Sequence, residues 1–218
     1  MSPTGSRQNK IRVVPGTIVT VCALLLLIGG WIIPYKFESF SILYKFGLDK
    51  IYLRSGKMVG ITIALLVYYE ILLASRFTVM EQIFTGKRLL GLHRLNGIFI
   101  AILAGLHPLL IKASEHFTPY TFAKKYYPEF IGIGLLCILL SHSFVAVFRN
   151  LIKLPYKKWL LWHRLGATLI LLIMPAHILY VSQTFKAGIP RQAALIIFSL
   201  NLAMILRIWL LRLINSSP

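Results

Sequence analysis

The sequence predicts an all-α membrane protein built as a bundle of six transmembrane helices. Of its 218 residues, 57% are hydrophobic, and the mean hydropathy is +0.75, well above that of a soluble domain. The apolar residues gather in runs of about 20, which is the length of a helix that crosses a bilayer. We expect helices because only they satisfy the backbone within one segment in lipid.

The six spans are expected to follow one another with short connections, except for two longer segments rich in aromatic and polar residues, 35–57 and 112–127. Pro34 and Tyr35 are expected to end the first span, which carries no convincing cleavage site and is expected to stay in the mature protein. The predicted spans are Thr17–Pro34, Met58–Ser75, Leu89–Ile111, Pro128–Phe148, Trp159–Val181 and Arg191–Leu211. The expected organisation is a cytoplasmic N-terminal segment (1–16), a transmembrane domain (17–212) and a short cytoplasmic tail (213–218).

The charge is strongly positive, with 24 Lys and Arg against 6 Asp and Glu and a formal net charge of +18. In a soluble protein this balance would suggest a nucleic-acid partner. Here the basic residues lie between apolar runs, so contact with anionic lipid and control of orientation explain them better. The side that holds the N-terminus carries more Lys and Arg than the opposite side, which predicts a multi-pass protein of the cell (inner) membrane with both termini cytoplasmic.

Two spans carry the same histidine spacing. His93 and His107 lie fourteen residues apart in the third span, and His163 and His177 lie fourteen apart in the fifth. Fourteen residues make almost four helical turns, so each pair shares one helix face, with its members about 21 Å apart along the axis. Both spans are odd-numbered and run in the same direction. His93 and His163 are therefore expected at the inner level, and His107 and His177 at the outer level.

Each level supplies two imidazoles, which is what a haem iron takes from a protein. Zinc or copper would need three or four ligands around one ion. The sequence lacks a Cys-x-x-Cys-His motif, so we expect two b-type haems between the third and fifth helices. The alternative, four structural histidines that join helices, must also explain the two identical spacings.

Glycines and arginines near the histidines fit this prediction, and each also has an ordinary role in a membrane helix. Gly97 and Gly166 lie on or near the ligand face and would let a flat macrocycle approach the backbone, although close helix packing uses glycine equally well. Arg94 and Arg164 lie at the inner mouth, where they would pair with haem propionates or serve as positive-inside anchors.

Three further ionisable residues are expected to have structural roles. His142 is interpreted as a hydrogen-bonding core residue rather than a ligand, and His116 as a solvated residue of the outer loop. Glu70 lies in the second span and is expected to pair with a basic residue at the inner surface, such as Arg76.

At these residues the chain resembles the ferric-reductase transmembrane domain superfamily, which includes ferric reductases, NADPH oxidases and the haem subunit of bacterial methionine-sulfoxide reductase systems. The resemblance covers roughly Met58–Leu211. It rests on the six spans, the two histidine pairs and the following stretches: Leu92-His93-Arg94-Leu95, Leu72–Ser75 with Arg76, and Arg88-Leu89-Leu90. It implies that His93 and His163 bind the inner haem iron, and His107 and His177 the outer one.

Many members of this superfamily continue into cytosolic flavin and nicotinamide domains, whereas the sequence shows no G-x-G-x-x-G fingerprint. The expected function is transmembrane electron transfer, as the haem-bearing component of an oxidoreductase. FAD and NAD(P)H would act only through a separate flavin reductase or a dehydrogenase domain that this sequence lacks. The acceptor would be ferric iron, dioxygen or a partner protein on the outer face. The alternatives are a quinol-linked cytochrome b subunit and a non-redox transporter or scaffold.

Overall fold

The computed structural model is all-helical and describes residues 21–37, 45–74, 84 and 86–215, with no strand in these ranges. Five of its helices are long and apolar enough to cross a membrane. They are α3 (Gly47–Ala74), α5 (Gly86–Ala113), α6 (Tyr127–Phe148), α7 (Tyr156–Val181) and α8 (Gly188–Asn215), with short 3-10 helices at Lys124–Tyr126 and Gln183–Phe185. The predicted all-α, multi-pass membrane fold is confirmed.

One further helix, Val21–Lys36, precedes these five in the chain and is shorter than they are in its described part. The predicted end at Pro34 is wrong, because the helix runs on to Lys36 and the Phe37 N–H donates to the Ile33 carbonyl at 2.9 Å. Proline removes one backbone donor, but an apolar helix tolerates that loss where neighbours compensate. The predicted start, from Thr17 to Thr20, lies outside the described residues.

The helix α3 begins at Gly47 rather than at Met58, so residues 47–57 of the predicted connector 35–57 are helical. Asp49, Lys50 and Arg54 make this part too polar to be recognised as a membrane run. Its Leu53 and Gly56 are nonetheless buried, and a Cβ at Gly56 would lie 2.7 Å from Cδ1 of Ile111 on α5. At the other end of the chain, α8 extends to Asn215 and so into the predicted tail. The predicted segment 1–16 and residues 216–218 lie outside the described part.

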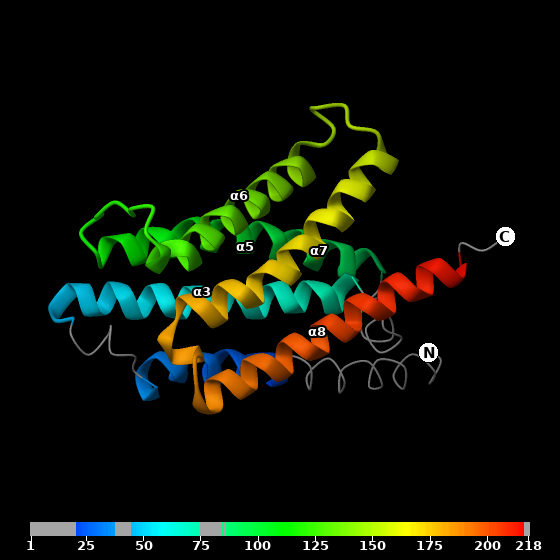
Figure 1. The fold of residues 1–218 in the computed structure, drawn as a ribbon. Coiled ribbons are helices and arrows are strands. Elements are labelled where there is room, and N and C mark those ends of the chain that lie inside the picture. The colour runs from blue at the N-terminus through cyan, green and yellow to red at the C-terminus, as the bar shows by residue number, and fades with distance from the viewer. Residues whose placement is uncertain (1–20, 38–44, 75–83, 85, 216–218) are drawn as a thin grey trace, which may run out of the picture.

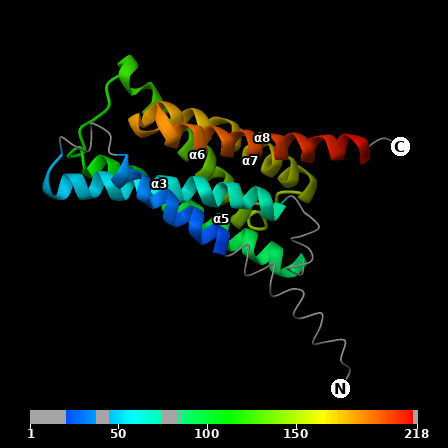
Figure 2. The ribbon, with the colours of Figure 1, turned by 90° about the horizontal axis from the view of Figure 1, so that it is seen from below.

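The five long helices alternate in direction, so α5 and α7 run the same way (Figures 1 and 2). The turn between α6 and α7 and the last residues of α8 lie at the same end of the bundle (Figure 1). Close packing joins α3 to α5 and α6 to α7, and α5 also packs against α6, whereas α5 and α7 approach each other less closely. Contact between α5 and α7 therefore depends on side chains and not on close backbone packing.

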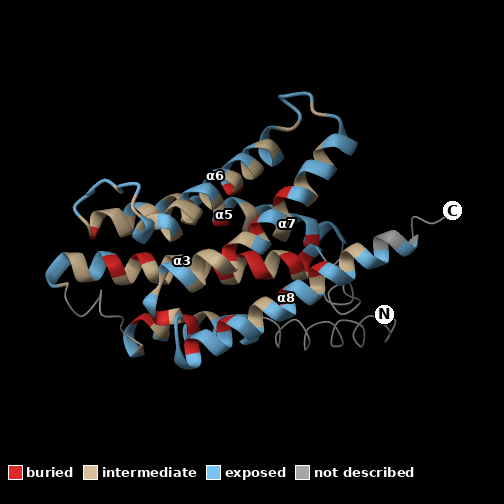
Figure 3. Cartoon of the chain, in the orientation of Figure 1, coloured by how far each residue is buried: buried red, intermediate tan, exposed pale blue. Residues whose placement is uncertain are grey.

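Buried side chains concentrate where the helices cross, and the outward faces are exposed and apolar (Figure 3). The buried cluster consists of Ala64, Val67, Tyr68, Ile71, Ile100, Ala104, Leu139, Ile170 and Met174. Large exposed residues such as Leu95, Ile102 and Leu169 point away from this core. An apolar exterior of this kind is what a bilayer solvates.

The contacts of helix Val21–Lys36 with α3 include a hydrogen bond, a close approach at a glycine, and a cation–π contact of Arg54 over the Tyr35 ring at 4.7 Å. Trp31 Nε1–H donates to Oγ1 of Thr62 at 2.9 Å. A Cβ atom at Gly30 would lie 2.8 Å from Cγ2 of Ile61, whereas a Cβ at Gly29 would meet no atom within 4 Å. Gly30 therefore sets how closely this helix approaches α3.

We predict that Gly30→Val lowers the thermal unfolding temperature in detergent, because overpacking a close contact costs about 1–3 kcal/mol. The matched variant Gly29→Val should leave it unchanged, since that position faces open space. Equal effects of the two substitutions would contradict the packing of this helix on α3.

Candidate cofactor site

The four predicted histidines meet in two pairs between α5 and α7. The His93 and His163 rings have centroids 5.8 Å apart with planes at 78°, and the His107 and His177 rings have centroids 6.5 Å apart with planes at 86°. We call these two pairs the His93 level and the His107 level. The parallel course of α5 and α7 brings residues of equal helical height together.

At the His107 level, each ring bonds to a backbone carbonyl of a neighbouring helix, α3 for His107 and α6 for His177. Nδ1 of His107 lies 2.8 Å from the Gly56 carbonyl of α3, and Nδ1 of His177 lies 3.1 Å from the Pro128 carbonyl of α6. A carbonyl only accepts, so Nδ1 carries the proton in both rings and Nε2 keeps its lone pair. Metal-binding histidines typically use this arrangement, in which the second nitrogen fixes the tautomer and the ring orientation.

A glycine one helical turn beyond each carbonyl makes room for the ring. A Cβ at Gly60 would lie 2.9 Å from Cε1 of His107, and a Cβ at Gly132 would lie 2.4 Å from Cε1 of His177. Both contacts are closer than a real Cβ tolerates. The same pattern, a carbonyl at i and a glycine at i+4, therefore seats both rings on different helices.

At the His93 level, the rings contact side chains of neighbouring residues instead of backbone carbonyls. Nδ1 of His93 contacts Oε2 of the Glu70 carboxylate on α3. The His163 ring stacks between Trp159, with centroids 5.2 Å apart, and His142, with centroids 4.5 Å apart. Among the described residues, the buried Nδ1 of His163 has no hydrogen-bond partner.

The ring separations fit one iron between each pair. With a metal–nitrogen bond of about 2 Å and a ring centre roughly 1 Å behind the nitrogen, two opposed imidazoles on one metal have centroids about 6 Å apart. The separations of 5.8 and 6.5 Å bracket this value. The described residues include no group of three or more His, Cys, Asp or Glu placed around a single ion. Two imidazoles at such a separation are compatible with a haem iron, and the ligand roles of the four histidines stay predictions.

The predicted glycines differ in their surroundings. A Cβ at Gly166 would lie 2.5 Å from Nδ1 of His142, so the His142 ring fills the space beside this glycine. A Cβ at Gly97 would meet no atom within 4 Å. Arg94 is exposed, and Arg164 is half-buried with its Nε lacking a hydrogen-bond partner in the described part of the chain. Their parts in cofactor binding stay predictions.

The three other ionisable residues have specific partners. His142 was expected to form hydrogen bonds, but its Nδ1 has no such partner among the described residues, and its ring stacks on His163. His116 is 79% exposed, yet its Nε2 lies 3.0 Å from Oδ2 of Asp49. Glu70 contacts His93, while its expected partner Arg76 lies outside the described residues.

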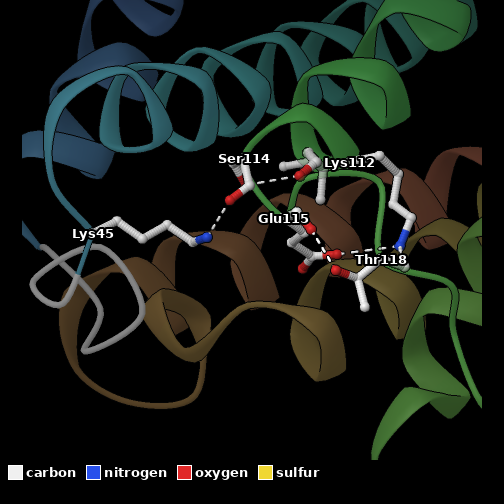
Figure 4. Close-up of polar contacts among 6 residues, drawn as sticks. Lys45, Lys112, Ser114, Glu115 and Thr118 are labelled. Carbon is white, nitrogen blue, oxygen red and sulfur yellow. Dashed lines mark hydrogen bonds and ion pairs between the residues drawn. The ribbon is translucent and has the colours of Figure 1, made fainter.

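Beside the His107 level, the α5–α6 loop is fastened to the start of α3 (Figure 4). Lys45 donates to the buried Ser114 carbonyl, and Lys112 contacts Thr118 and Glu115 (Figure 4). Lys112 Nζ also lies 3.4 Å above the Tyr120 ring, and burial together with the nearby carboxylates raises the pKa of Tyr120 to about 12. The loop at this end of the bundle is therefore ordered by its own polar contacts.

Sequence reasoning missed the residues that hold the rings. Gly56 and Gly60 form a small-xxx-small pair, a recognised sign of close helix approach, but nothing in the sequence pairs them with His107. Trp159 lies four residues before His163, and this helical spacing indicates contact on one face. Every residue has a backbone carbonyl, so the residue type at position 128 does not indicate that its carbonyl bonds to His177.

Comparison with known proteins identifies the family of the chain. The model of the ferric reductase like transmembrane component matches residues 58–174, more than half of the chain. The chain belongs to this family. The match includes three of the four paired histidines and ends at Met174, just before His177. No curated protein and no solved structure matches the chain.

We predict that Gly132→Ala displaces the His177 ring from its place on α6 and lowers the thermal unfolding temperature in detergent, at a cost of about 1–3 kcal/mol. Gly134→Ala is the matched control, because a Cβ two residues further along the same helix meets nothing within 4 Å. A harmless Gly132→Ala would show that His177 does not lie against α6.

Proposed function

We propose that this ferric reductase-like chain transfers single electrons across a membrane through two b-type haems, one at each histidine level. The observation that carries the proposal is the pair of ring separations, 5.8 and 6.5 Å, each of which suits one iron between two imidazoles. Family membership supports it, since residues 58–174 match the ferric reductase like transmembrane component.

The histidines would act as axial ligands: His93 and His163 at the inner level, and His107 and His177 at the outer level. A haem bound in this way supplies a one-electron iron couple at each level. Two imidazoles leave no coordination position for substrate, so the ligand set favours outer-sphere electron transfer. With Nδ1 of His107 and of His177 bonded to a backbone carbonyl, Nε2 would be the nitrogen that binds the metal.

Apolar side chains fill the helices between the two levels. Ile100 and Ala104 lie between the two histidines of α5, and Ile170 and Met174 between those of α7, all of them buried. These side chains form an apolar layer between the levels, which are about 21 Å apart along the helix axis. An electron can tunnel through such a layer.

The orientation in the membrane follows from the charge of the loops, and the classes of donor and acceptor are those that the family resemblance implies. With both termini cytoplasmic, the His93 level faces the cytosol of the cell (inner) membrane, and the donor is a flavin reductase or dehydrogenase domain that uses FAD and NAD(P)H. The outer acceptor is ferric iron, dioxygen or a partner protein. Full crossing toward the positive outside is favoured by about 2.3 kcal/mol per 100 mV.

Gly97 would give the macrocycle access to the backbone, whereas the His142 ring fills the space beside Gly166 and leaves this glycine a packing role. Arg94 and Arg164 would pair with propionates at the inner mouth. The open space beside Gly97 supports its part in this arrangement. The unpartnered Nε of Arg164, within the described part of the chain, supports a role for this guanidinium in holding an anionic group.

We predict two b-type haems per chain in the purified protein, measured as a pyridine haemochrome count with a reduced-minus-oxidised spectrum. His107→Ala should remove one haem and leave the other, because each iron needs both imidazoles of its own level only. His163→Ala should likewise remove one haem, and the double variant should hold none.

A haem-free wild-type protein, expressed with ample haem, would overturn the proposal and leave the transporter or scaffold alternative. Loss of both haems in His107→Ala, with the fold intact by circular dichroism, would contradict the assignment of independent levels.

We also predict that His142→Ala keeps two haems per chain. The His142 ring stacks on His163 at 4.5 Å with planes at 26°, and two stacked rings at this distance leave no room for an iron between them. The variant should lose only packing energy, seen as a lower thermal unfolding temperature. Loss of a haem in His142→Ala but not in His163→Ala would move the ligand role from His163 to His142.

A further inference from the structure

The described helices contain one carboxylate away from their first turns. Asp49 and Glu129 lie in the first turns of α3 and α6, whereas Glu70 lies in the apolar part of α3 beside the buried residues Tyr68 and Ile71. Its side chain is 16% exposed. Burying an unpaired carboxylate in apolar surroundings costs free energy, so the group that contacts Glu70 indicates the role of this side chain.

That partner is a ring of the His93 level. Oε2 of Glu70 contacts Nδ1 of His93, and the His93 ring also faces His163 with centroids 5.8 Å apart. Because Nδ1 lies against the carboxylate, Nε2 would be the nitrogen left for a metal. A carboxylate that accepts the Nδ1–H of a metal-bound histidine fixes the ring and raises the basicity of the ligand.

The two levels differ in the charge of these acceptors. His107 and His177 donate to the neutral carbonyls of Gly56 and Pro128. His93 instead meets a carboxylate. A more basic ligand and a nearby negative charge both favour the oxidised iron, so this contact acts on the redox balance between the levels.

Building on the proposed function, we propose that Glu70 is a positioning residue for His93: it holds the ring toward His163 and lowers the reduction potential of the haem at the His93 level. The electron is thereby favoured at the His107 level, which biases transfer outward. The positive charges of Arg94 and Arg164, at the same end of the bundle, would raise the reduction potential. The contribution of Glu70 is therefore measured as the change in that potential when its charge is removed.

The test is a potentiometric titration of the two haems in the full chain, with and without Glu70→Gln. The glutamine keeps the size of the side chain but removes the charge. We expect the midpoint potential of one haem to rise while the other stays constant, with at least a tenfold change in the oxidised-to-reduced ratio at a fixed potential, which is about 59 mV for one electron. The low-spin ferric EPR signal of the same haem should shift, because the ligand becomes less basic.

Asp49→Asn is the matched control, since it makes the same chemical change on the same helix, about 30 Å away along the axis. It should leave both potentials unchanged. Glu70→Asp, which keeps the charge, should restore most of the potential. His107→Ala combined with Glu70→Gln assigns the shift to the His93 level, because the remaining haem must be the one that moves.

The outcomes separate the two proposals. A haem-free wild type overturns both the proposed function and the role of Glu70. Two haems in the wild type, with potentials unchanged in Glu70→Gln, overturn the role of Glu70 alone. If Glu70→Gln loses both haems, Glu70→Asp decides: retention of two haems at the wild-type potentials supports the role, and a loss equal to that of Glu70→Gln refutes it.

Discussion

The arrangement of the bundle depends on hydrogen bonds from histidine rings to the backbone of neighbouring helices. His107 on α5 reaches the Gly56 carbonyl of α3, and His177 on α7 reaches the Pro128 carbonyl of α6. Each bond satisfies a ring N–H in an apolar environment and also fixes the rotation of one helix against another. The glycines at positions 60 and 132 permit the approach. The meeting of the two rings between α5 and α7 follows from these two separate anchors.

The sequence was sufficient for the features that depend on period and composition. Fourteen-residue spacing places two histidines on one helix face whatever the surroundings, and runs of apolar residues of membrane length form helices because lipid offers the backbone no other partner. The alternating direction of the helices then brings His93 to His163 and His107 to His177. These steps need no knowledge of how the helices rotate or cross.

The features that the sequence left undetermined depend on the register between helices. The contact of Glu70 with His93 joins residues of α3 and α5 whose relative height is set by the segment between them. The early start of α3 at Gly47 was missed because Asp49, Lys50 and Arg54 mask an apolar face that becomes visible only when Leu53 and Gly56 pack against a neighbour. Residue type alone could not identify the carbonyl of Pro128 as an acceptor.

The use of main-chain acceptors at the His107 level has a genetic consequence. Every residue carries a carbonyl, so no missense change at position 56 or 128 deletes the acceptor itself. Replacing a glycine here adds volume instead, and a Cβ at Gly56, Gly60 or Gly132 would lie less than 3.0 Å from a neighbouring side chain. Missense changes should therefore disrupt the His107 level by adding side-chain volume, not by removing the acceptor. In the opposite half His93 contacts the side chain of Glu70, and a single missense change can remove that contact.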